Sequence, residues 1–257
     1  MLMQGKKGLI MGVANDRSIA WGIAKSLADN GASIALTYQG EALKKRVEPL
    51  AQSINSDILI PCDVADSLSM ENVFKTLKEK WGQLDFLVHG IGFSNKDELR
   101  GKYYNTTSEN FNQTMHISCY SFTEACRLAE PLMNEGGSIL TLTYYGAEQV
   151  MPHYNVMGVA KAALEASVRY LAVDLGEKNV RVNAISAGPM RTLAGAAIAN
   201  ARDVFKYTSE NSSLKRNANL DELGNSAMYL VSDLSSAITG EIHYVDCGFN
   251  IIGMPKS

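Results

Sequence analysis

The chain has 257 residues, of which 46% are hydrophobic and 20% are charged, a composition typical of a globular protein with one large core. Its net charge of −3 argues against nucleic acid as the main partner. No apolar run of about 18 residues occurs and the N-terminal residues lack a signal-peptide pattern, so neither a membrane span nor export is expected.

The cysteines form neither CxxC pairs nor clusters with histidine, which argues against a metal site. We interpret them as small buried side chains in a reducing compartment, so a cytoplasmic protein is expected. They are Cys62, Cys119, Cys126 and Cys247.

Short apolar runs typical of strands alternate with helical periodicity along the whole chain. The predicted strands cover residues 7–11, 33–38, 57–61, 84–89, 138–143, 180–185 and 241–245. The predicted helices cover residues 18–30, 41–53, 68–81, 110–133, 154–175, 193–207 and 221–232. This alternation predicts a single α/β domain over residues 1–257, built on a Rossmann-like, doubly wound parallel sheet of seven strands. Such sheets bind ligands at the carboxyl ends of their strands.

The loop after the first predicted strand has features of a phosphate-binding turn, although it lacks a full GxGxxG pattern. Gly12 permits a tight turn, and backbone N–H groups near Ser18 and Ile19 open a helix whose positive end can hold a pyrophosphate. An ordinary strand–helix turn, in which Ser18 is only an N-cap, remains the alternative.

The loops after the second and third strands bear on the adenosine half of a dinucleotide. Gln39 and Glu41 follow the second strand with no cation before Lys44, and Glu41 would repel a 2′-phosphate, which favours NADH over NADPH. Asp63 follows the third strand, where a carboxylate could bind an adenine amino group. The alternative is a helix N-cap, for which Asp66 is the better candidate.

Later loops supply further candidates. The glycine-rich stretch 89–93 lets a cofactor backbone approach closely, and we interpret His89 as a packing residue. The Gly188–Pro189 turn followed by Thr192 suits contacts to a nicotinamide carboxamide. Residues 193–201 are small, which indicates either a tightly packed helix or part of a mobile substrate lid over 193–207.

Tyr154 lies near the start of a predicted helix and Lys161 lies almost two turns further on, so both side chains leave the same face. Tyr144 arrives from the end of the fifth predicted strand. A phenol beside an ammonium is a proton donor whose pKa the cation is expected to lower. A Tyr and a Lys at this spacing also occur by chance on many helices, and a tyrosine after a proline is often only an anchor.

Three longer motifs indicate a family. NAxSAGPxRT at 183–192, YNVMGxAKAxLE at 154–165 and GEIHYVDCGF at 240–249 resemble the short-chain dehydrogenase/reductase superfamily. The Tyr-x6-Lys spacing resembles its bacterial NADH-dependent enoyl-[acyl-carrier-protein] reductase branch. The resemblance extends from Gly5 to about Gly253.

The resemblance implies that Tyr154 hydrogen-bonds the thioester carbonyl, that Lys161 holds the nicotinamide ribose, and that Tyr144 is the second catalytic tyrosine. It implies a cofactor site made of Gly12, Ser18, Ile19, Gln39, Asp63, Val64, Ile91, Lys161, Met190, Arg191, Thr192, Leu193 and Ala194. The acyl chain needs an apolar slot, and the candidates for the substrate site are Ser94, Tyr144, Tyr154, Met157 and Phe205. Gly90, in place of a common serine, and Ser94, in place of a small apolar residue, depart from the family pattern.

The implied reaction is the NADH-dependent reduction of the trans-2 double bond of an enoyl thioester, the last step of the fatty acid elongation cycle. A 3-ketoacyl reductase of the same superfamily and a non-catalytic NAD sensor remain alternatives. The implied partners are acyl carrier protein and a homotetramer of this chain. Because carrier proteins are acidic, we expect a basic patch on this protein where the carrier docks. The candidate residues are Arg202, Lys206, Lys215 and Arg216. The alternative is that these four residues are ordinary surface charges.

Overall fold

The computed structural model describes residues 1–193 and 201–254 and contains a sheet of seven parallel strands in the order β3-β2-β1-β4-β5-β6-β7. The prediction of a doubly wound parallel sheet is therefore confirmed. The order reverses between β1 and β4, which is where such sheets bind ligands. The strands are β1 Lys7–Met11, β2 Ser33–Tyr38, β3 Ile58–Pro61, β4 Leu84–His89, β5 Met133–Thr143, β6 Arg181–Ala187 and β7 Ile242–Val245.

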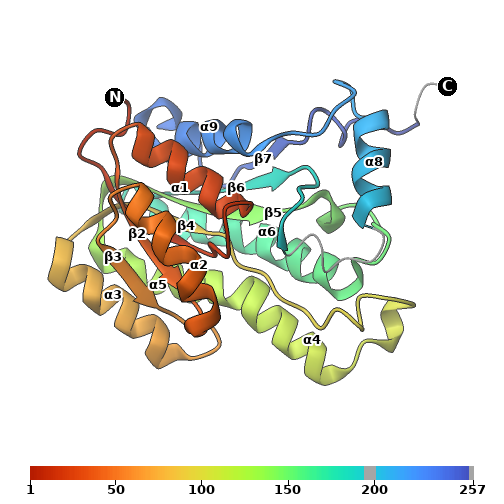
Figure 1. Cartoon of the computed structure of the whole chain (residues 1–257), viewed down its shortest axis with the longest axis horizontal. Helices are drawn as coiled ribbons and strands as arrows, with labels where there is room; N and C mark the ends of the chain where they lie inside the picture. Colours follow the sequence, from red (N-terminus) through yellow and green to blue (C-terminus); the bar gives the residue numbers. More distant parts are fainter. Residues whose placement is uncertain (194–200, 255–257) are drawn as a thin grey trace.

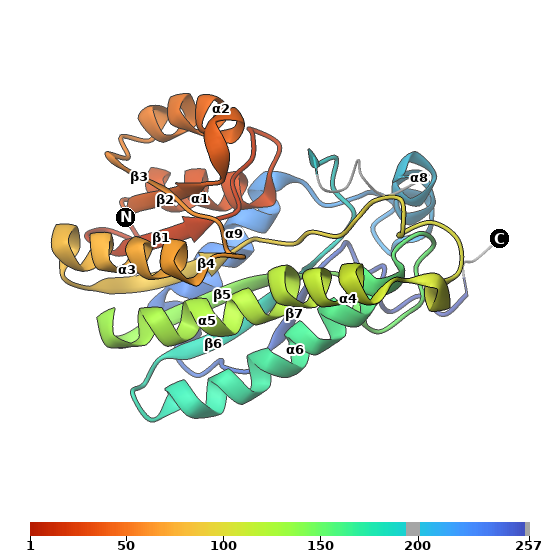
Figure 2. The same ribbon diagram turned by 90° about the horizontal axis from the view of Figure 1, so that it is seen from below.

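Helices cover both faces of the sheet (Figure 1) and leave its carboxyl edge to loops and α8. The turned view separates the α1, α2 and α9 layer from the α3, α5 and α6 layer (Figure 2). The helices are α1 Ile19–Asp29, α2 Gly40–Ser53, α3 Ser67–Trp81, α4 Ser108–Met115, α5 Ser121–Ala129, α6 Asn155–Gly176, α8 Ala201–Asn211 and α9 Leu220–Val231. None of the described helices is long and apolar enough to cross a membrane.

Each face of the sheet has its own apolar core. Leu27 of α1 and Leu230 of α9 pack on one face, whereas Phe122 of α5 and Leu164 of α6 pack on the other. All four side chains are fully buried, and burying a side chain of this size contributes about 1.5–3 kcal/mol. These two cores hold the carboxyl ends of the strands in fixed register.

The prediction of one helix over residues 110–133 is wrong. The structure divides this segment into α4, a π-helical turn at His116–Tyr120, α5 and a 3₁₀ turn at Glu130–Leu132. The Ser118 hydroxyl, in the π turn, accepts a hydrogen bond from Phe93 N at 3.0 Å and donates one to Phe93 O at 3.1 Å. This tertiary contact favours the extra residue in the turn, and sequence periodicity contains no trace of it.

The prediction of a helix over residues 193–207 is confirmed for its second half, residues 201–207. The structure has α8 at Ala201–Asn211, which continues four residues beyond the predicted end. The stretch 194–200 lies outside the described residues. The other predicted helices differ from the observed ones by at most one residue at each end.

Candidate active site

Tyr144 and Tyr154 meet at the carboxyl edge of the sheet. Tyr144 follows the last residue of β5, and Tyr154 is the N-cap of α6. Their ring centroids lie 5.2 Å apart with the ring planes at 78°, an edge-to-face geometry that aromatic pairs prefer. Tyr154 is only 7% exposed, whereas Tyr144 is half-buried. The structure thus brings together the two tyrosines predicted to act in catalysis.

The backbone on both sides of Tyr154 adopts an unusual conformation. His153 and Asn155 have φ values of 59° and 39°, in the left-handed region that non-glycine residues rarely occupy. The Asn155 amide group donates to the carbonyl oxygens of Glu98 and Gly101 at 3.4 and 3.3 Å. The start of α6 is therefore tied to the β4–α4 connection, which fixes the direction of the Tyr154 side chain.

Two glycines that sequence reasoning missed make room for the Tyr154 ring. A Cβ on Gly146 would lie 2.4 Å from Tyr154 Cδ1 and 3.3 Å from Tyr144 Cδ1. A Cβ on Gly158 would lie 2.7 Å from the Gly146 carbonyl oxygen. The available signal was Gly158 itself, because a glycine inside a helix often marks close packing.

Lys161 projects from the second turn of α6 and is 8% exposed. Its Nζ donates a hydrogen bond of 2.7 Å to the carbonyl oxygen of Leu142 in β5. A Cβ on Gly92 would lie 3.7 Å from this Nζ, so the glycine-rich loop after β4 passes beside the ammonium. Burial lowers the pKa of Lys161 to about 8, which leaves the side chain mostly protonated at neutral pH.

The expectation of a lowered phenol pKa is wrong. Burial raises the pKa of Tyr154, and the neighbouring Tyr144 and Glu165 raise it further. Burial and the charge of Asp246 raise the pKa of Tyr144 to about 12. Burial is the largest cause for both phenols, because desolvation disfavours the charged phenolate. Both phenols therefore keep their protons and can donate hydrogen bonds.

An apolar cluster surrounds the tyrosine pair. Leu99, from the β4–α4 connection, and Met157, from α6, are buried against Tyr154. Phe111 of α4 packs against the same cluster. Met157, a predicted substrate residue, thus lies beside the predicted catalytic tyrosine, and the cluster offers an apolar wall for a hydrocarbon chain.

The β1–α1 loop fits a dinucleotide. Gly12 has φ 96°, and a Cβ there would lie 2.1 Å from the Gly90 carbonyl oxygen, so only glycine allows these loops to touch. The Ser18 hydroxyl does not cap α1; it accepts from the N–H groups of Ala14 and Asn15 at 3.0 and 3.1 Å. The hydroxyl therefore shapes the loop, and the amino-terminal end of α1 can bind a pyrophosphate.

Asp63 and Asp66 divide the roles expected after β3. Asp66 caps α3 by accepting from Leu68 N at 3.0 Å, as predicted. Asp63 Oδ1 accepts from Ala65 N at 2.9 Å, so one of its two oxygens is engaged in the turn. Val64 between them is buried. The adenine contact of Asp63 stays a prediction.

The remaining nucleotide candidates lie along the same edge. Gln39 is the exposed N-cap of α2, and Glu41 in the first turn of that helix lies 3.9 Å from Lys44 Nζ. Lys44, the first cation after β2, is therefore paired with the Glu41 carboxylate, which would repel a 2′-phosphate. This agrees with the predicted preference for NADH over NADPH. Ile91 is half-buried after β4 and Ile19 is half-buried at the start of α1.

The segment after β6 contacts α8 through a cation–π interaction. The Arg191 guanidinium lies 4.5 Å from the centroid of the Phe205 ring, so a predicted cofactor residue touches a predicted substrate residue. The other predicted cofactor residues here are Met190, Thr192, Leu193 and Ala194. Ala194 lies outside the described residues.

The two departures from the family pattern have visible surroundings. A Cβ on Gly90 would lie 3.0 Å from the Met11 carbonyl oxygen and 3.1 Å from Ala20 Cβ, so a serine there would be tightly enclosed. The Ser94 hydroxyl lies 2.9 Å from Thr114 Oγ1 and also bonds the Asn110 amide. Ser94 is thus engaged with α4, and its substrate contact stays a prediction.

Two of the predicted carrier-docking residues are engaged in ion pairs. Lys206 Nζ lies 3.8 Å from Glu210, and Arg216 binds both carboxylate oxygens of Glu222 at 2.6 and 2.8 Å. Arg202 is exposed on α8. Exposed ion pairs contribute little stability, so an acidic partner could displace them.

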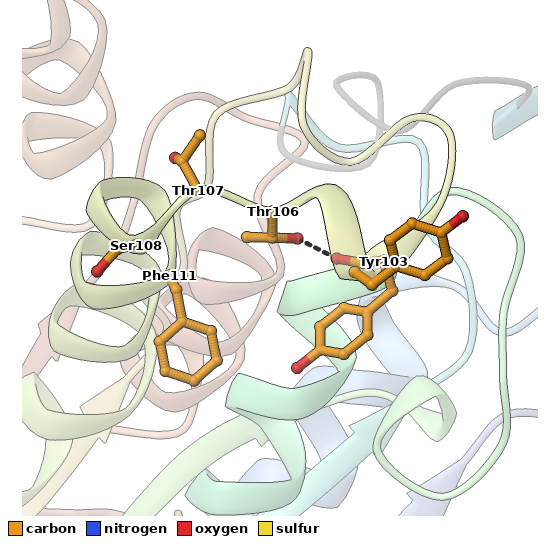
Figure 3. A pocket seen from close by; sticks show the side chains of 6 residues that line it. Tyr103, Thr106, Thr107, Ser108 and Phe111 are labelled. Carbon is orange, nitrogen blue, oxygen red and sulfur yellow. Dashed lines mark hydrogen bonds between the residues drawn. The ribbon is translucent and has the colours of Figure 1, made fainter.

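A shallow pocket of about 360 Å³ lies in the β4–α4 connection (Figure 3). The described residues that line it are Tyr103, Tyr104, Thr106, Thr107, Ser108 and Phe111. None of them was predicted as a site residue, but Phe111 also packs on the cluster around Tyr154. The pocket therefore adjoins the tyrosine cluster without containing it. Within the described ranges, no group of three His, Cys, Asp or Glu side chains could hold a metal ion.

A doubly wound sheet with a glycine-lined nucleotide cradle and a buried Tyr–Lys pair on one helix defines an oxidoreductase that uses a dinucleotide. The profile of the family described as Enoyl-(Acyl carrier protein) reductase matches residues 12–250. Enoyl-[acyl-carrier-protein] reductase [NADH] 2 of Rhizobium meliloti (strain 1021) is 63% identical over 254 residues, which cover 99% of this chain and 95% of that protein.

Solved structures agree with this assignment. FabI from Candidatus Liberibacter asiaticus has a TM-score of 0.97 at 58% identity, with 99% of each chain covered. The enoyl-(acyl-carrier-protein) reductase from Anaplasma phagocytophilum, solved in complex with NAD, has a TM-score of 0.97 at 58% identity and covers 100% of this chain and 98% of its own. The chain belongs to the NADH-dependent enoyl-[acyl-carrier-protein] reductase family, as its motifs predicted.

Proposed function

We propose that Tyr154, Lys161 and Tyr144 carry out the reaction of the family in this protein. That reaction is the NADH-dependent reduction of the trans-2 double bond of an enoyl thioester carried on acyl carrier protein, at the end of the fatty acid elongation cycle. The cofactor is held by the Gly12 turn and the amino-terminal end of α1 at its pyrophosphate, and by Lys161 at its nicotinamide ribose.

NADH, when bound, supplies the hydride that adds to C3 of the enoyl thioester. Negative charge then develops on the thioester oxygen, and a donor aimed at this oxygen stabilises the transition state more than the ground state. Tyr154 is this donor, because its burial keeps the phenol protonated. Lys161 adds positive potential, and Tyr144 fixes the Tyr154 ring from its edge. Protonation at C2 completes the saturated acyl chain.

The observation that supports this proposal best is a buried, neutral Tyr154 phenol on the same helix as the buried Lys161 ammonium. Tyr154→Phe should lower kcat about 10²–10³-fold while leaving NADH affinity nearly intact, because the hydrogen bond forms in the transition state. Lys161→Ala should also weaken NADH binding in a fluorescence titration. Tyr145→Phe, next to Tyr144, is the matched control and should retain wild-type kcat.

The same assay distinguishes the alternatives. NADH oxidation should be observed with a crotonyl thioester and not with an acetoacetyl thioester, which a 3-ketoacyl reductase would prefer. Wild-type kcat in Tyr154→Phe, or unchanged NADH affinity in Lys161→Ala, would refute the assigned roles. Absence of turnover with both thioesters in the wild type would favour a sensor.

The assembly and location of the protein are part of the proposal. Val159, Tyr170 and Val173 of α6 are 37%, 78% and 75% exposed, and their spacing puts them on one face of the helix. This apolar face supports the homotetramer that the resemblance implies. Light scattering should give four chains, and Tyr170→Glu should reduce that number. Four cysteines without disulfides support a cytoplasmic location.

We also propose that the chain forms one NAD-binding domain whose segment 193–207 acts as a substrate lid. The exposed surface of α8 and its contact to Arg191 support this role. Hydrogen exchange in α8 should slow when cofactor and a substrate analogue bind together. Equal exchange with and without these ligands would contradict it.

A further inference from the structure

A buried carboxylate lies one helical turn beyond Lys161. Glu165 is 6% exposed, and its Oε1 accepts a hydrogen bond of 2.6 Å from the Thr143 hydroxyl, which is itself buried. Thr143 is the last residue of β5 and directly precedes Tyr144. The mechanism above does not use Glu165, yet a carboxylate is costly to bury unless its charge has a partner.

Glu165 and Lys161 together attach α6 to the end of β5. Lys161 Nζ donates to the Leu142 carbonyl at 2.7 Å, and one turn later Glu165 accepts from Thr143, the next residue of the strand. Successive residues of β5 are thus held by successive turns of α6. This arrangement fixes the end of β5 and therefore the position of Tyr144, the residue that follows it.

We infer that Glu165 is a positioning residue for Lys161: it holds the end of β5 through Thr143 and places a buried carboxylate one helical turn from the Lys161 ammonium. This inference rests on the proposed role of Lys161 in holding the cofactor. A neutral residue of the same shape could supply the hydrogen-bond acceptor, but it could not supply the charge.

The charges around Lys161 agree with this role. The groups that face it from other elements are His89 at the end of β4 and Cys119 in the π turn. His89 is neutral at pH 7 because burial lowers its pKa to about 3. Burial lowers the pKa of Lys161, whereas Cys119 and Glu165 raise it. Among His89, Cys119 and Glu165, the group with a carboxylate that can pair with the Lys161 ammonium is Glu165.

The surroundings of Glu165 decide how much of that charge is present. Burial raises its pKa, and Glu148, which follows the 3₁₀ turn before α6, raises it as well. The Thr143 hydrogen bond, Arg169 on the next turn and Lys161 lower it. Tyr244 of β7 bonds Glu148 on the outer side. Burial is the largest of these causes, so the net pKa of Glu165 lies above its ordinary value, while the Thr143 hydroxyl and the two cations act against this shift.

The test is the pH dependence of NADH affinity, measured by fluorescence titration between about pH 6.5 and 9.5 on the full chain. If the ammonium holds the cofactor, the wild-type Kd rises as pH increases through the pKa of Lys161. Glu165→Gln retains the hydrogen-bond acceptor and removes the charge. It should move the midpoint of this rise down by at least about half a pH unit.

Thr143→Val is the matched control, because it removes the hydrogen bond and leaves the carboxylate. It should move the midpoint by less than Glu165→Gln does, because the carboxylate remains, even if the position of Tyr144 changes and kcat falls. A Glu165→Gln midpoint equal to that of the wild type would overturn the inference, since a purely structural role leaves the titration of Lys161 unchanged.

Two further variants separate the possible failures. If Glu165→Gln does not fold, the double variant Thr143→Val with Glu165→Met replaces both partners by apolar groups and should show the same lowered midpoint. Lys161→Ala should show no such pH dependence at all. If Lys161→Ala showed the same pH dependence of NADH affinity as the wild type, the proposed role of Lys161 itself would be refuted.

Discussion

Gly146 offers a way to disturb the catalytic tyrosines without touching their chemistry. A Cβ at this position would lie 2.4 Å from Tyr154 Cδ1 and 2.7 Å from its Cε1, whereas ordinary contacts begin at 3.4 Å. The Tyr154 ring must therefore move by about 1 Å in Gly146→Ala. Tyr144 Cδ1, at 3.3 Å from the same point, closes the other side, so neither ring can move freely.

A displacement of about 1 Å at a reacting group can reduce the rate about 10²-fold, which corresponds to about 2.7 kcal/mol of transition-state stabilisation. We expect this loss in kcat for a crotonyl thioester in a steady-state assay of NADH oxidation. The NADH affinity should stay near that of the wild type, because the cofactor residues are not displaced. This split between kcat and binding distinguishes a shifted tyrosine from a damaged fold.

Gly176→Ala is the matched control. Gly176 ends the same helix, and a Cβ there would meet no atom within 4 Å. This variant should retain wild-type kcat. If Gly146→Ala also retains it, the edge-to-face placement of the tyrosine rings does not limit the reaction, and the assigned role of this geometry is wrong.

The remaining predictions concern cofactor, carrier and pH. The kcat/KM for NADH should exceed that for NADPH by at least about tenfold, because Glu41 stands beside Lys44; equal efficiencies would contradict this. Arg202→Glu with Lys206→Glu should raise KM for a carrier-linked enoyl substrate and not for a short coenzyme A thioester; equal changes would indicate a damaged lid. Because the folded-state pKa of His89 is lowered to about 3, unfolding takes up a proton below about pH 6.5 and stability falls as pH decreases. Between pH 7 and 5, urea unfolding should show about 2 kcal/mol more loss for the wild type than for His89→Gln, and parallel losses would exclude His89 as the cause.

Local patterns predicted most of the fold. The strands at 7–11, 33–38 and 84–89 match β1, β2 and β4 residue for residue, because each is a short apolar run enclosed by turn residues. The break between α4 and α5 was not predictable in this way. It depends on the contact of Ser118 with Phe93, 25 residues away in the chain, and helical periodicity does not record such a partner.

In the site, too, local sequence patterns predicted some features, whereas features that depend on tertiary contacts were missed. The spacing of Tyr154 and Lys161 placed both on one helix, and the structure buries both at the carboxyl edge of the sheet. The direction of the Tyr154 pKa shift was wrong because its largest cause is burial, which a sequence does not display. Glu165 was missed for a related reason, since its partner Thr143 lies on another element.

The left-handed turn at His153 and Asn155 has a consequence for protein engineering. Each such residue costs about 1–3 kcal/mol, so glycine at His153, which adopts this φ value without strain, can raise the melting temperature. Glycine at Asn155 also relieves the strain, but it removes the two amide hydrogen bonds that tie α6 to the β4–α4 connection. The same substitution gives the chain on either side of Tyr154 more conformational freedom. A screen for heat-resistant variants would therefore select changes at His153 that slow turnover, and thermal tolerance and catalytic speed would be improved by different substitutions.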